Sequence, residues 1–352
     1  MINKIFNCIS IHNGGGITYL SLMHHEIDKK GNLIFLDHRA KKLLKPFLNA
    51  KIKFFKKSLF RNLFVFKERF KYYLFFKNYL KRCNKKEIFH EYFINGIPPL
   101  IRFPISNNKV FILFQNKNLF SYLNYFNKNL FFKSKFIIYH LVHSFLINLF
   151  IKNTDTIIVQ TDSMKETIKK IKAKNKVIVN DSYWKDLTLE CYEDIILNKY
   201  DKYNNNVILK KLKEISKIDK IFFYPSSFEP HKNHKMLFRA FEKLSFNSKK
   251  NIKLVVTIDS NEVPNKYRNN ELIFFIGKQP IYVINQIYRI VDFLIFPSLN
   301  ESLGLPLIEA SLLNLPIIAA NLDYVYEVCK PIITFNPISI EDIYQKINES
   351  IN

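Results

Sequence analysis

Short apolar runs alternate with amphipathic stretches along most of the chain. The clearest series of strands is predicted in the second half, at 221–224, 252–257, 272–276, 293–296 and 317–319. Helices are predicted between these strands by the spacing of apolar positions, at 235–244, 281–290 and 305–313. Near-continuous apolar strands that alternate with helices are typical of a parallel sheet covered on both faces. The second half therefore predicts an α/β domain.

The first half begins with the same kind of alternation. An apolar run at 4–11 leads into a glycine-rich turn, Asn13–Gly16, and then into a helical stretch that ends near Lys29. Strand, glycine turn and helix form the start of a βαβ unit. Further strands are predicted at 33–36, 110–114, 156–160 and 176–179. We place the domain boundary near 200, which predicts two Rossmann-like domains at 1–200 and 201–352.

Residues 41–86 depart from this alternation. The segment contains no glycine and is dense in Phe, Tyr, Leu, Lys and Arg. Its apolar positions between Leu59 and Leu74 approximate helical spacing. We therefore expect one or two basic amphipathic helices, inserted into the first domain.

The charge of the chain is concentrated in its first half. The formal net charge is +24, and residues 1–200 carry +21 of it, with 35 Lys and Arg against 14 Asp and Glu. This imbalance predicts an anionic partner for the first domain. For the segment 41–86 we favour a membrane surface or a lipid phosphate. A solvated insertion of biased composition remains open, whereas no recognisable motif supports nucleic-acid binding.

Cysteine usage and apolar segments bear on where the protein works. The four cysteines are scattered without paired spacing, which fits a reducing compartment and disfavours a cysteine zinc site. The first apolar run lacks a cleavage pattern and predicts a core strand, not a signal peptide. The 16-residue run 136–151 is shorter than the ~20 residues of a membrane span. We expect a cytoplasmic protein that is peripheral at the inner face of the membrane.

The loop that follows the strand at 293–296 carries the most specific chemistry. Gly304 allows close approach of the backbone to a ligand, and Pro306 stands at the start of the following helix. Free N–H groups at a helix start can hold an anion such as a diphosphate. Glu301 and Glu309 lie in this loop and one turn into the helix, and ionised carboxylates accept hydrogen bonds from sugar hydroxyls.

The segment Phe296–Ala310 resembles the signature of the group 1 (family 4) retaining glycosyltransferases, which have the GT-B fold. That resemblance implies two Rossmann-like domains whose parallel sheets face each other across a cleft. Four further segments are similar to family landmarks, at 13–16, 155–161, 315–319 and 326–328. The stretch 224–234 resembles the segment that carries the phosphate-binding lysine of the family, here Lys232. The most similar subset makes bacterial surface polysaccharide, including lipopolysaccharide O-antigen.

The resemblance also implies roles for individual residues. Glu301 is expected to contact the donor sugar, Glu309 the ribose hydroxyls, and Lys232 the diphosphate. Many family members carry a histidine after a middle strand of the first domain, and Asn116 is expected in its place. Many also carry an arginine where Ser227 stands. The remaining residues expected to bind the donor are Gly15, Gly16, Gly277, Ser302, Leu303, Gly304 and Leu305.

No metal or other cofactor is expected. The sequence contains no Asp-x-Asp motif, which is the usual metal clamp of the other main glycosyltransferase fold. His231 and His234 lie near Glu229, but on a loop that opens a helix, which is weak support for a zinc site.

The expected activity is that of a hexosyltransferase that uses a nucleotide sugar, with UDP or GDP, and a glycan or polyprenyl-diphosphate-linked acceptor. One alternative is an epimerase-like enzyme of the same fold, although the additional catalytic acids and histidines of such enzymes are not found. Another is a non-enzymatic basic protein that binds membrane or nucleic acid, which leaves the loop with Glu301 and Glu309 unexplained.

Overall fold

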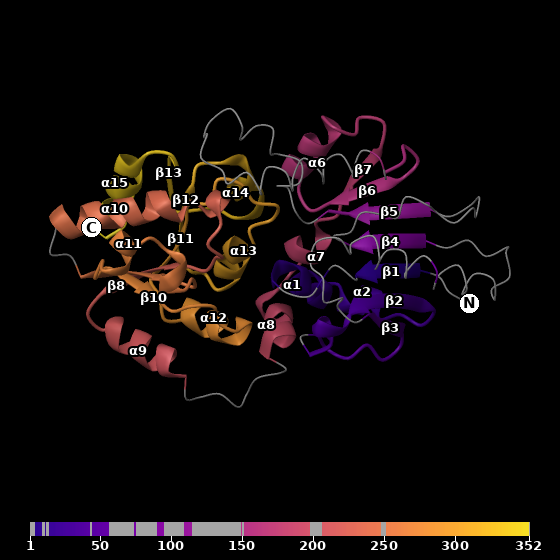
Figure 1. Cartoon of the computed structure of the whole chain (residues 1–352), viewed down its shortest axis with the longest axis horizontal. Helices are drawn as coiled ribbons and strands as arrows, with labels where there is room; N and C mark the ends of the chain where they lie inside the picture. The colour runs from indigo at the N-terminus through magenta and orange to yellow at the C-terminus, as the bar shows by residue number, and fades with distance from the viewer. Residues whose placement is uncertain are drawn as a thin grey trace. The chain divides into compact units, whose positions relative to one another are not determined.

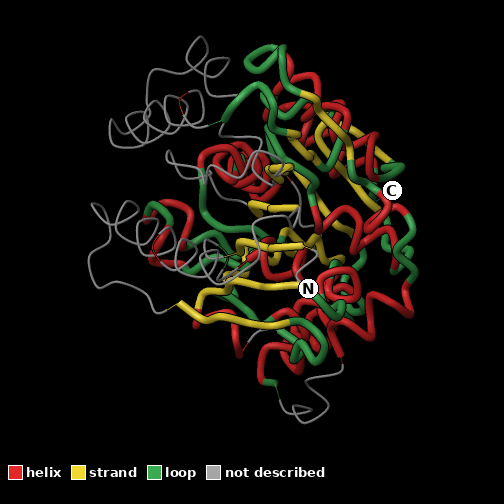
Figure 2. The backbone as a smooth tube through the Cα atoms, turned by 90° about the vertical axis from the view of Figure 1, so that its right-hand side faces the viewer, coloured by secondary structure: helices red, strands yellow, loops and turns green. Residues whose placement is uncertain are grey.

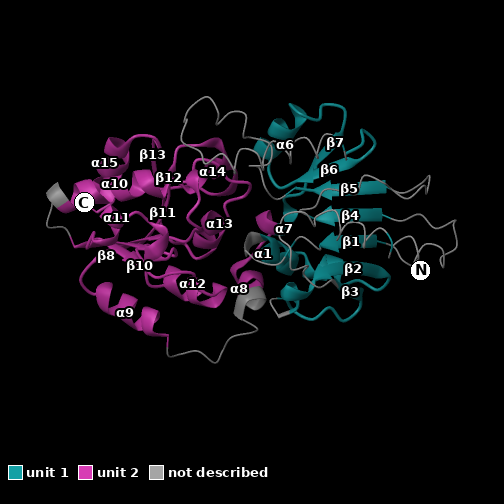
Figure 3. Cartoon of the chain, in the orientation of Figure 1, with its two compact units in different colours: residues 1–183 teal, residues 184–352 magenta. Residues whose placement is uncertain are grey.

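The chain divides into two compact units, residues 1–183 and 184–352 (Figure 3). The division lies earlier than the predicted boundary near 200, because residues after Tyr183 pack with the second unit. A computed structural model provides the coordinates. It describes residues 4–8, 11, 14–42, 44–55, 74, 90–94, 109–114, 149, 151–197, 206–247 and 251–351.

The first unit is built on a seven-stranded parallel sheet, as the alternation of its sequence predicts (Figure 1). Its strands are β1 (Lys4–Cys8), β2 (Asn32–Asp37), β3 (Lys51–Phe55), β4 (His90–Ile94), β5 (Lys109–Leu113), β6 (Thr156–Val159) and β7 (Lys176–Val179). Their spatial order is β3-β2-β1-β4-β5-β6-β7, so the order reverses between β1 and β4. The described helices that start in this unit are α1 (Gly14–Leu22), α2 (His24–Ile27), the 3₁₀ helix η1 (His38–Lys42), α6 (Asp162–Lys169) and α7 (Ser182–Lys185).

The start of the segment 41–86 belongs to this sheet, so the expectation of an amphipathic insertion is wrong there. Strand β3 pairs in parallel with β2. The carboxylate of Asp28 fixes the preceding loop by accepting backbone hydrogen bonds from Leu48, Asn49 and Ala50 at 2.8–2.9 Å. Ile52 packs against the core between two lysines, a period-two pattern that specifies a strand. Residues 56–73 and 75–86, where the helical spacing lies, are outside the described residues.

The second unit is built on a six-stranded parallel sheet. Its strands are β8 (Lys220–Tyr224), β9 (Ile252–Val256), β10 (Ile273–Phe275), β11 (Phe293–Phe296), β12 (Ile317–Ala320) and β13 (Ile333–Phe335). Their order is β10-β9-β8-β11-β12-β13, which is the doubly wound order, with its reversal between β8 and β11. The first five of these strands lie where the sequence predicts them, within one or two residues.

Helices cover both faces of this second sheet, as right-handed crossovers between parallel strands require. They are α8 (Leu189–Leu197), α9 (Val207–Ile215), η2 (Pro230–Lys232), α10 (His234–Asn247), η3 (Ser260–Glu262), α11 (Asn265–Arg268), α12 (Ile281–Tyr288), α13 (Leu305–Leu312), α14 (Asp323–Val328) and α15 (Ile340–Glu349). Helix α10 packs against α15, and α12 packs against α8 and α9. Figure 2 shows the strands of the described chain in yellow and its helices in red.

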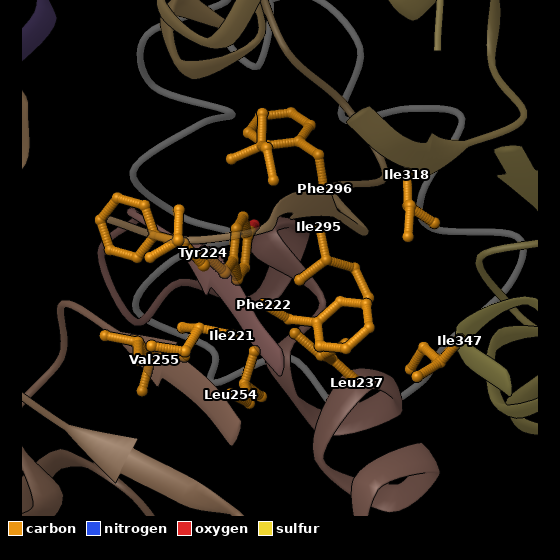
Figure 4. Packing of buried hydrophobic residues seen from close by; sticks show 14 of the residues in the cluster. Ile221, Phe222, Tyr224, Leu237, Leu254, Val255, Ile295, Phe296, Ile318 and Ile347 are labelled. Carbon is orange, nitrogen blue, oxygen red and sulfur yellow. The ribbon is translucent and has the colours of Figure 1, made fainter. Parts of the chain in front are cut away.

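The core of the second unit surrounds β8 and β11 (Figure 4). Phe222 and Tyr224 of β8 and Phe296 of β11 are fully buried. The rings of Phe222 and Phe293 stack with centroids 5.0 Å apart. Burial of each such side chain stabilises the fold by ~1.5–3 kcal/mol, so the two neighbouring strands form a firm base for the loops that follow them.

No helix within the described residues is long and apolar enough to cross a membrane. Of the apolar run 136–151, only Leu149 and Ile151 are described.

Candidate active site

The candidate site lies at the carboxyl ends of β8 and β11. These strands are neighbours in the sheet, and the strand order reverses between them. In open α/β sheets, ligands bind beyond the carboxyl ends of the strands at such a reversal. The loop after β8 carries Lys232 and the loop after β11 carries Glu301, so the topology brings together the two predicted residues.

Lys232 and Glu301 form an ion pair. Lys232 Nζ lies 2.6 Å from Glu301 Oε1, and the two side chains are only 18% and 11% exposed. Ser298 Oγ donates a second hydrogen bond to the same carboxylate oxygen at 2.7 Å. The site therefore places a cation and a carboxylate side by side, one suited to a phosphate and the other to sugar hydroxyls.

Direct bonds between the two loops hold this pair in place. Leu299 N donates to His231 O at 2.8 Å. Asn233 Nδ2 donates to Pro297 O at 3.1 Å and to Pro337 O at 2.8 Å. Asn233 adopts the left-handed conformation with φ 60°, which asparagine tolerates better than most residues. The residue after Lys232 thus ties its loop to the loop of Glu301.

Buried tyrosine hydroxyl groups form hydrogen bonds to the two loops that carry Lys232 and Glu301. Tyr224 Oη donates to Lys232 O at 2.8 Å and lies 2.9 Å from Ser298 Oγ. Tyr324 Oη donates to Ser298 O at 2.7 Å. Burial raises the pKa of Tyr224, which keeps its hydroxyl protonated and able to donate.

The two histidines beside Lys232 are held neutral. Burial, followed by the nearby charge of Lys232, lowers the pKa of His231 and lowers the pKa of His234 to about 3. His234 Nε2 lies 3.0 Å from Ser226 Oγ. Over the part of the chain that the structure describes, His, Cys, Asp and Glu side chains form no group of three that could hold a metal ion. The absence of a metal from the reaction stays a prediction.

The start of α13 has the geometry that an anion site needs. Gly304 precedes the helix with φ 68° and ψ 56°, and Leu307 N donates to its carbonyl at 2.8 Å. The left-handed φ favours glycine at this position, and a Cβ atom on Gly304 would also make a tight contact at 3.1 Å with Leu307 Cδ1. Ser302 and Leu303 lead into this turn and Leu305 begins the helix with an N–H that can face an anion, whereas Pro306 has no N–H and Leu307 N donates to Gly304 O.

Glu309 lies one turn further along α13 and is buried, with 8% exposure. Tyr288 Oη donates to Glu309 Oε2 at 2.8 Å. Burial raises the pKa of Glu309, and the hydroxyls of Tyr288 and Tyr192 oppose that rise. Neither tyrosine was singled out from the sequence, because no local pattern links them to Glu309.

Gly277 follows the edge strand β10 and adopts φ 65°. Its N–H donates to Ile258 O at 3.1 Å, and a Cβ atom on it would meet nothing within 4 Å. Strand β9 separates β10 from β8, so Gly277 lies at the same end of the sheet as Lys232 without adjoining the ion pair. Its proposed contact with the donor stays a prediction.

Two predicted residues of the first unit, Gly15 and Gly16, follow β1, at the reversal of the other sheet. Gly15 and Gly16 stand in the first turn of α1, whereas the sequence placed them in a turn before that helix. A helix start after the first strand is again a position suited to an anion. Asn116 lies outside the described residues.

Part of the second unit matches a known protein family. Residues 208–352 match the model of the family Glycosyl transferases group 1. No curated protein sequence matches the chain significantly.

Solved structures resemble the whole chain. The sucrose-phosphate synthase of Thermosynechococcus elongatus superposes with a TM-score of 0.66 at 12% identity, over 100% of this chain and 90% of that chain. Anabaena HepE, solved in complex with UDP-glucose, gives 0.63 at 16% identity over 99% and 90%. WaaG, a glycosyltransferase involved in lipopolysaccharide biosynthesis, gives 0.62 at 12% identity over 99% and 90%. At these identities the likeness shows the fold, which is GT-B. Residues 208–352 thus form a group 1 glycosyltransferase domain, and the chain is a glycosyltransferase.

Proposed function

We propose that this enzyme is a retaining hexosyltransferase that moves a sugar from a UDP or GDP donor to a glycan or polyprenyl-diphosphate-linked acceptor in the synthesis of cell-surface polysaccharide such as lipopolysaccharide O-antigen. The observation that carries the proposal is the Lys232–Glu301 pair, with α13 beginning a few residues later and Glu309 one turn into that helix. The complex of HepE with UDP-glucose supports a nucleotide-sugar donor.

In this proposal the enzyme works by stabilising its leaving group. The diphosphate gains negative charge as its bond to the donor sugar breaks, and Lys232 and the Leu305 N–H at the start of α13 are suited to bind that charge. When the donor binds, the ammonium group of Lys232 exchanges its ion pair with Glu301 for one with the phosphate. The carboxylate of Glu301 accepts hydrogen bonds from hydroxyl groups of the donor sugar. An oxygen of the departing phosphate helps to remove the proton from the attacking hydroxyl of the acceptor. No protein base and no metal ion is required by this route.

The acceptor is proposed from the charge of the first 200 residues, which is +21. A basic surface suits an acceptor with a diphosphate group at an anionic membrane, where we place the enzyme as a peripheral protein of the cytoplasmic face. The similarity to WaaG supports an acceptor of the lipopolysaccharide class. A soluble sugar phosphate is the second candidate, because sucrose-phosphate and trehalose-phosphate synthases share the fold.

A transfer assay tests this proposal. Labelled UDP- and GDP-hexoses are offered with a polyprenyl-diphosphate-linked glycan or with hexose phosphates, in buffer that contains EDTA. We expect label in the lipid-linked product, with the anomeric configuration of the donor retained by NMR. Transfer only to hexose phosphates would show that the acceptor is a soluble sugar phosphate and not a lipid-linked glycan. Inversion of configuration, or a strict need for Mg²⁺ or Mn²⁺, would overturn the mechanism.

A further inference from the structure

Ser226 lies two residues beyond the end of β8, on the loop that leads to Lys232. Its backbone is fixed by Thr257, which follows the neighbouring strand β9. Ser226 N donates to Thr257 Oγ1 at 2.9 Å, and Thr257 Oγ1 donates to Ser226 O at 3.2 Å. Because these backbone bonds hold the loop, the hydroxyl of Ser226 is not needed to attach it. That hydroxyl is partly buried at the end of the sheet where ligands bind.

The hydroxyl of Ser226 has a buried histidine as its partner. His234 begins α10, is 2% exposed, and lies against the rings of Phe228 and Phe238, with centroids 5.4 and 5.7 Å away. Its Nε2 lies 3.0 Å from Ser226 Oγ. Its other ring nitrogen, Nδ1, is buried and has no hydrogen-bond partner in the described part of the chain. The bond to Ser226 is therefore the polar contact that orients this ring.

This arrangement indicates which atom carries the proton. Burial lowers the pKa of His234 to about 3, so the ring is neutral and has one N–H. A buried N–H without an acceptor is rarer in proteins than a buried acceptor without a donor, which favours the proton on Nε2. Nε2 then donates to Ser226 Oγ and uses one of its two acceptor sites. The proton of the serine hydroxyl is left to donate to a ligand.

Tyr224 connects this pair to the cation of the candidate site. Its ring lies against that of His234, with centroids 4.9 Å apart, and its hydroxyl donates to Lys232 O at 2.8 Å. A phosphate group that binds Lys232 has further oxygens that accept hydrogen bonds, and a bond to a charged oxygen is stronger than one to a neutral acceptor. The proton of the Ser226 hydroxyl thus suits an anion held at this end of the sheet.

We propose that Ser226 donates its hydroxyl proton to a phosphate oxygen of the nucleotide-sugar donor, and that His234 is the positioning residue that fixes this hydroxyl by donating to it from Nε2. The inference rests on the proposed function, since it takes the anion at Lys232 to be the diphosphate of the donor. It adds a neutral hydrogen-bond donor to the charge of Lys232.

Calorimetric titration of Ser226→Ala with UDP and GDP tests the contact with phosphate. Loss of one hydrogen bond to a charged group should weaken binding of the cognate nucleotide by about tenfold. The matching nucleoside lacks phosphate and should bind the variant and the wild type equally, as measured by ligand-observed NMR. Ser245→Ala is the control, because this serine is exposed near the other end of α10, and its nucleotide affinity should equal that of the wild type.

Two substitutions of His234 test its positioning role. The side-chain amide nitrogen of His234→Gln can take the place of ring Nε2 and donate to Ser226 Oγ, whereas the shorter amide of His234→Asn cannot reach it. Both variants lose the ring, so their packing losses are similar. We expect about tenfold tighter nucleotide binding by His234→Gln than by His234→Asn. In a Ser226→Ala background this difference should vanish, because the residue through which His234 acts has been removed.

The possible failures are distinguishable. Unchanged nucleotide binding by Ser226→Ala, with normal binding by the wild type, would overturn this inference alone. Equal losses for the nucleotide and the nucleoside would reduce Ser226 to a structural role and also overturn it. Equal affinities of His234→Gln and His234→Asn would overturn the role of His234. Absence of nucleotide binding by the wild type would overturn the proposed function and this inference together.

Discussion

Lys232 Nζ lies 2.6 Å from Glu301 Oε1, although the two residues are 69 positions apart in the sequence. The pair forms because β8 and β11 are adjacent and parallel, so their following loops meet. Glu301 balances the charge of Lys232 in a largely buried place. A diphosphate must therefore compete with a carboxylate for this lysine, and mutation of the two residues should change the affinity for the nucleoside diphosphate in opposite directions.

Lys232→Ala should impair transfer and leave the fold intact. Loss of one group that stabilises the charge of the transition state typically costs ~2.7–4 kcal/mol, or 10²–10³ in kcat. Steady-state kinetics measure this loss, and circular dichroism checks the fold. Lys235→Ala is the control, because this nearby lysine is exposed on α10. Wild-type turnover in Lys232→Ala would remove Lys232 from the site.

Glu301→Gln should tighten binding of the nucleoside diphosphate and lower turnover. The substitution removes the negative charge that competes for Lys232, so affinity should rise by up to about tenfold, or ~1.4 kcal/mol. Turnover should fall because the donor sugar loses an ionised acceptor. Calorimetry and kinetics on one preparation separate these effects. Weaker nucleotide binding together with normal turnover would contradict the roles proposed here.

His234 should make the second unit sensitive to acid. Its pKa is lowered to about 3 in the folded protein, whereas the pKa of a histidine in the unfolded chain is about 6.5. Between these values the unfolded chain binds more protons, so the free energy of unfolding falls as the pH falls, by at most ~1.4 kcal/mol per pH unit. His234→Asn should flatten this dependence.

Thermal melting between about pH 7 and pH 5 measures the effect of His234 within this range. His25→Asn, at an exposed position, is the control for loss of a histidine. The same pH dependence of Tm in His234→Asn and in the wild type would contradict the buried, neutral state of His234.

The basic segment 41–86 should bind to anionic membranes. Residues 51–82 contain 11 Lys and Arg and one acidic residue. Each basic residue near an anionic leaflet contributes ~1 kcal/mol, and less beyond a Debye length of ~8 Å. Co-sedimentation with vesicles should need anionic lipid, fall with salt, and weaken when four basic residues are changed to Gln, namely Lys56, Lys57, Arg61 and Lys67.

A matched control for the membrane experiment removes the same charge elsewhere. Helix α9 and the turn after it carry exposed lysines at 210, 211, 213 and 217. Their change to Gln should leave vesicle binding unchanged. Equal binding to neutral vesicles, or equal loss in both variants, would contradict a membrane surface in the segment 41–86.

The sequence predicted the elements around the site because each carries a local signal. The strand Phe293–Phe296 is apolar throughout, and Gly304 with Pro306 specifies a turn into a helix. The alternation of strands and helices along the sequence also predicts a binding site at the carboxyl ends of the parallel strands. The direct contact of Lys232 with Glu301 depends on strand order, which is a property of the whole sheet.

Other features had no local signal to follow. The strand Lys51–Phe55 stands at the head of a basic, aromatic stretch, where the helical spacing further along dominated the interpretation. The hydrogen bond of Tyr288 to Glu309 depends on how α12 packs, and nothing near position 288 indicates a binding role. The domain boundary was placed in polar residues near 200, whereas packing of α8 assigns the residues after Tyr183 to the second unit.

Calorimetric titration of UDP and GDP into the wild type and Glu309→Gln tests the donor site most directly. One nucleotide should bind the wild type, and its affinity should fall about tenfold to hundredfold in Glu309→Gln, because ribose hydroxyls lose an ionised acceptor. Glu262→Gln, at an exposed position, should bind as the wild type does. Binding of neither nucleotide by the wild type, or equal affinity in Glu309→Gln, would contradict a nucleotide-sugar site at the start of α13.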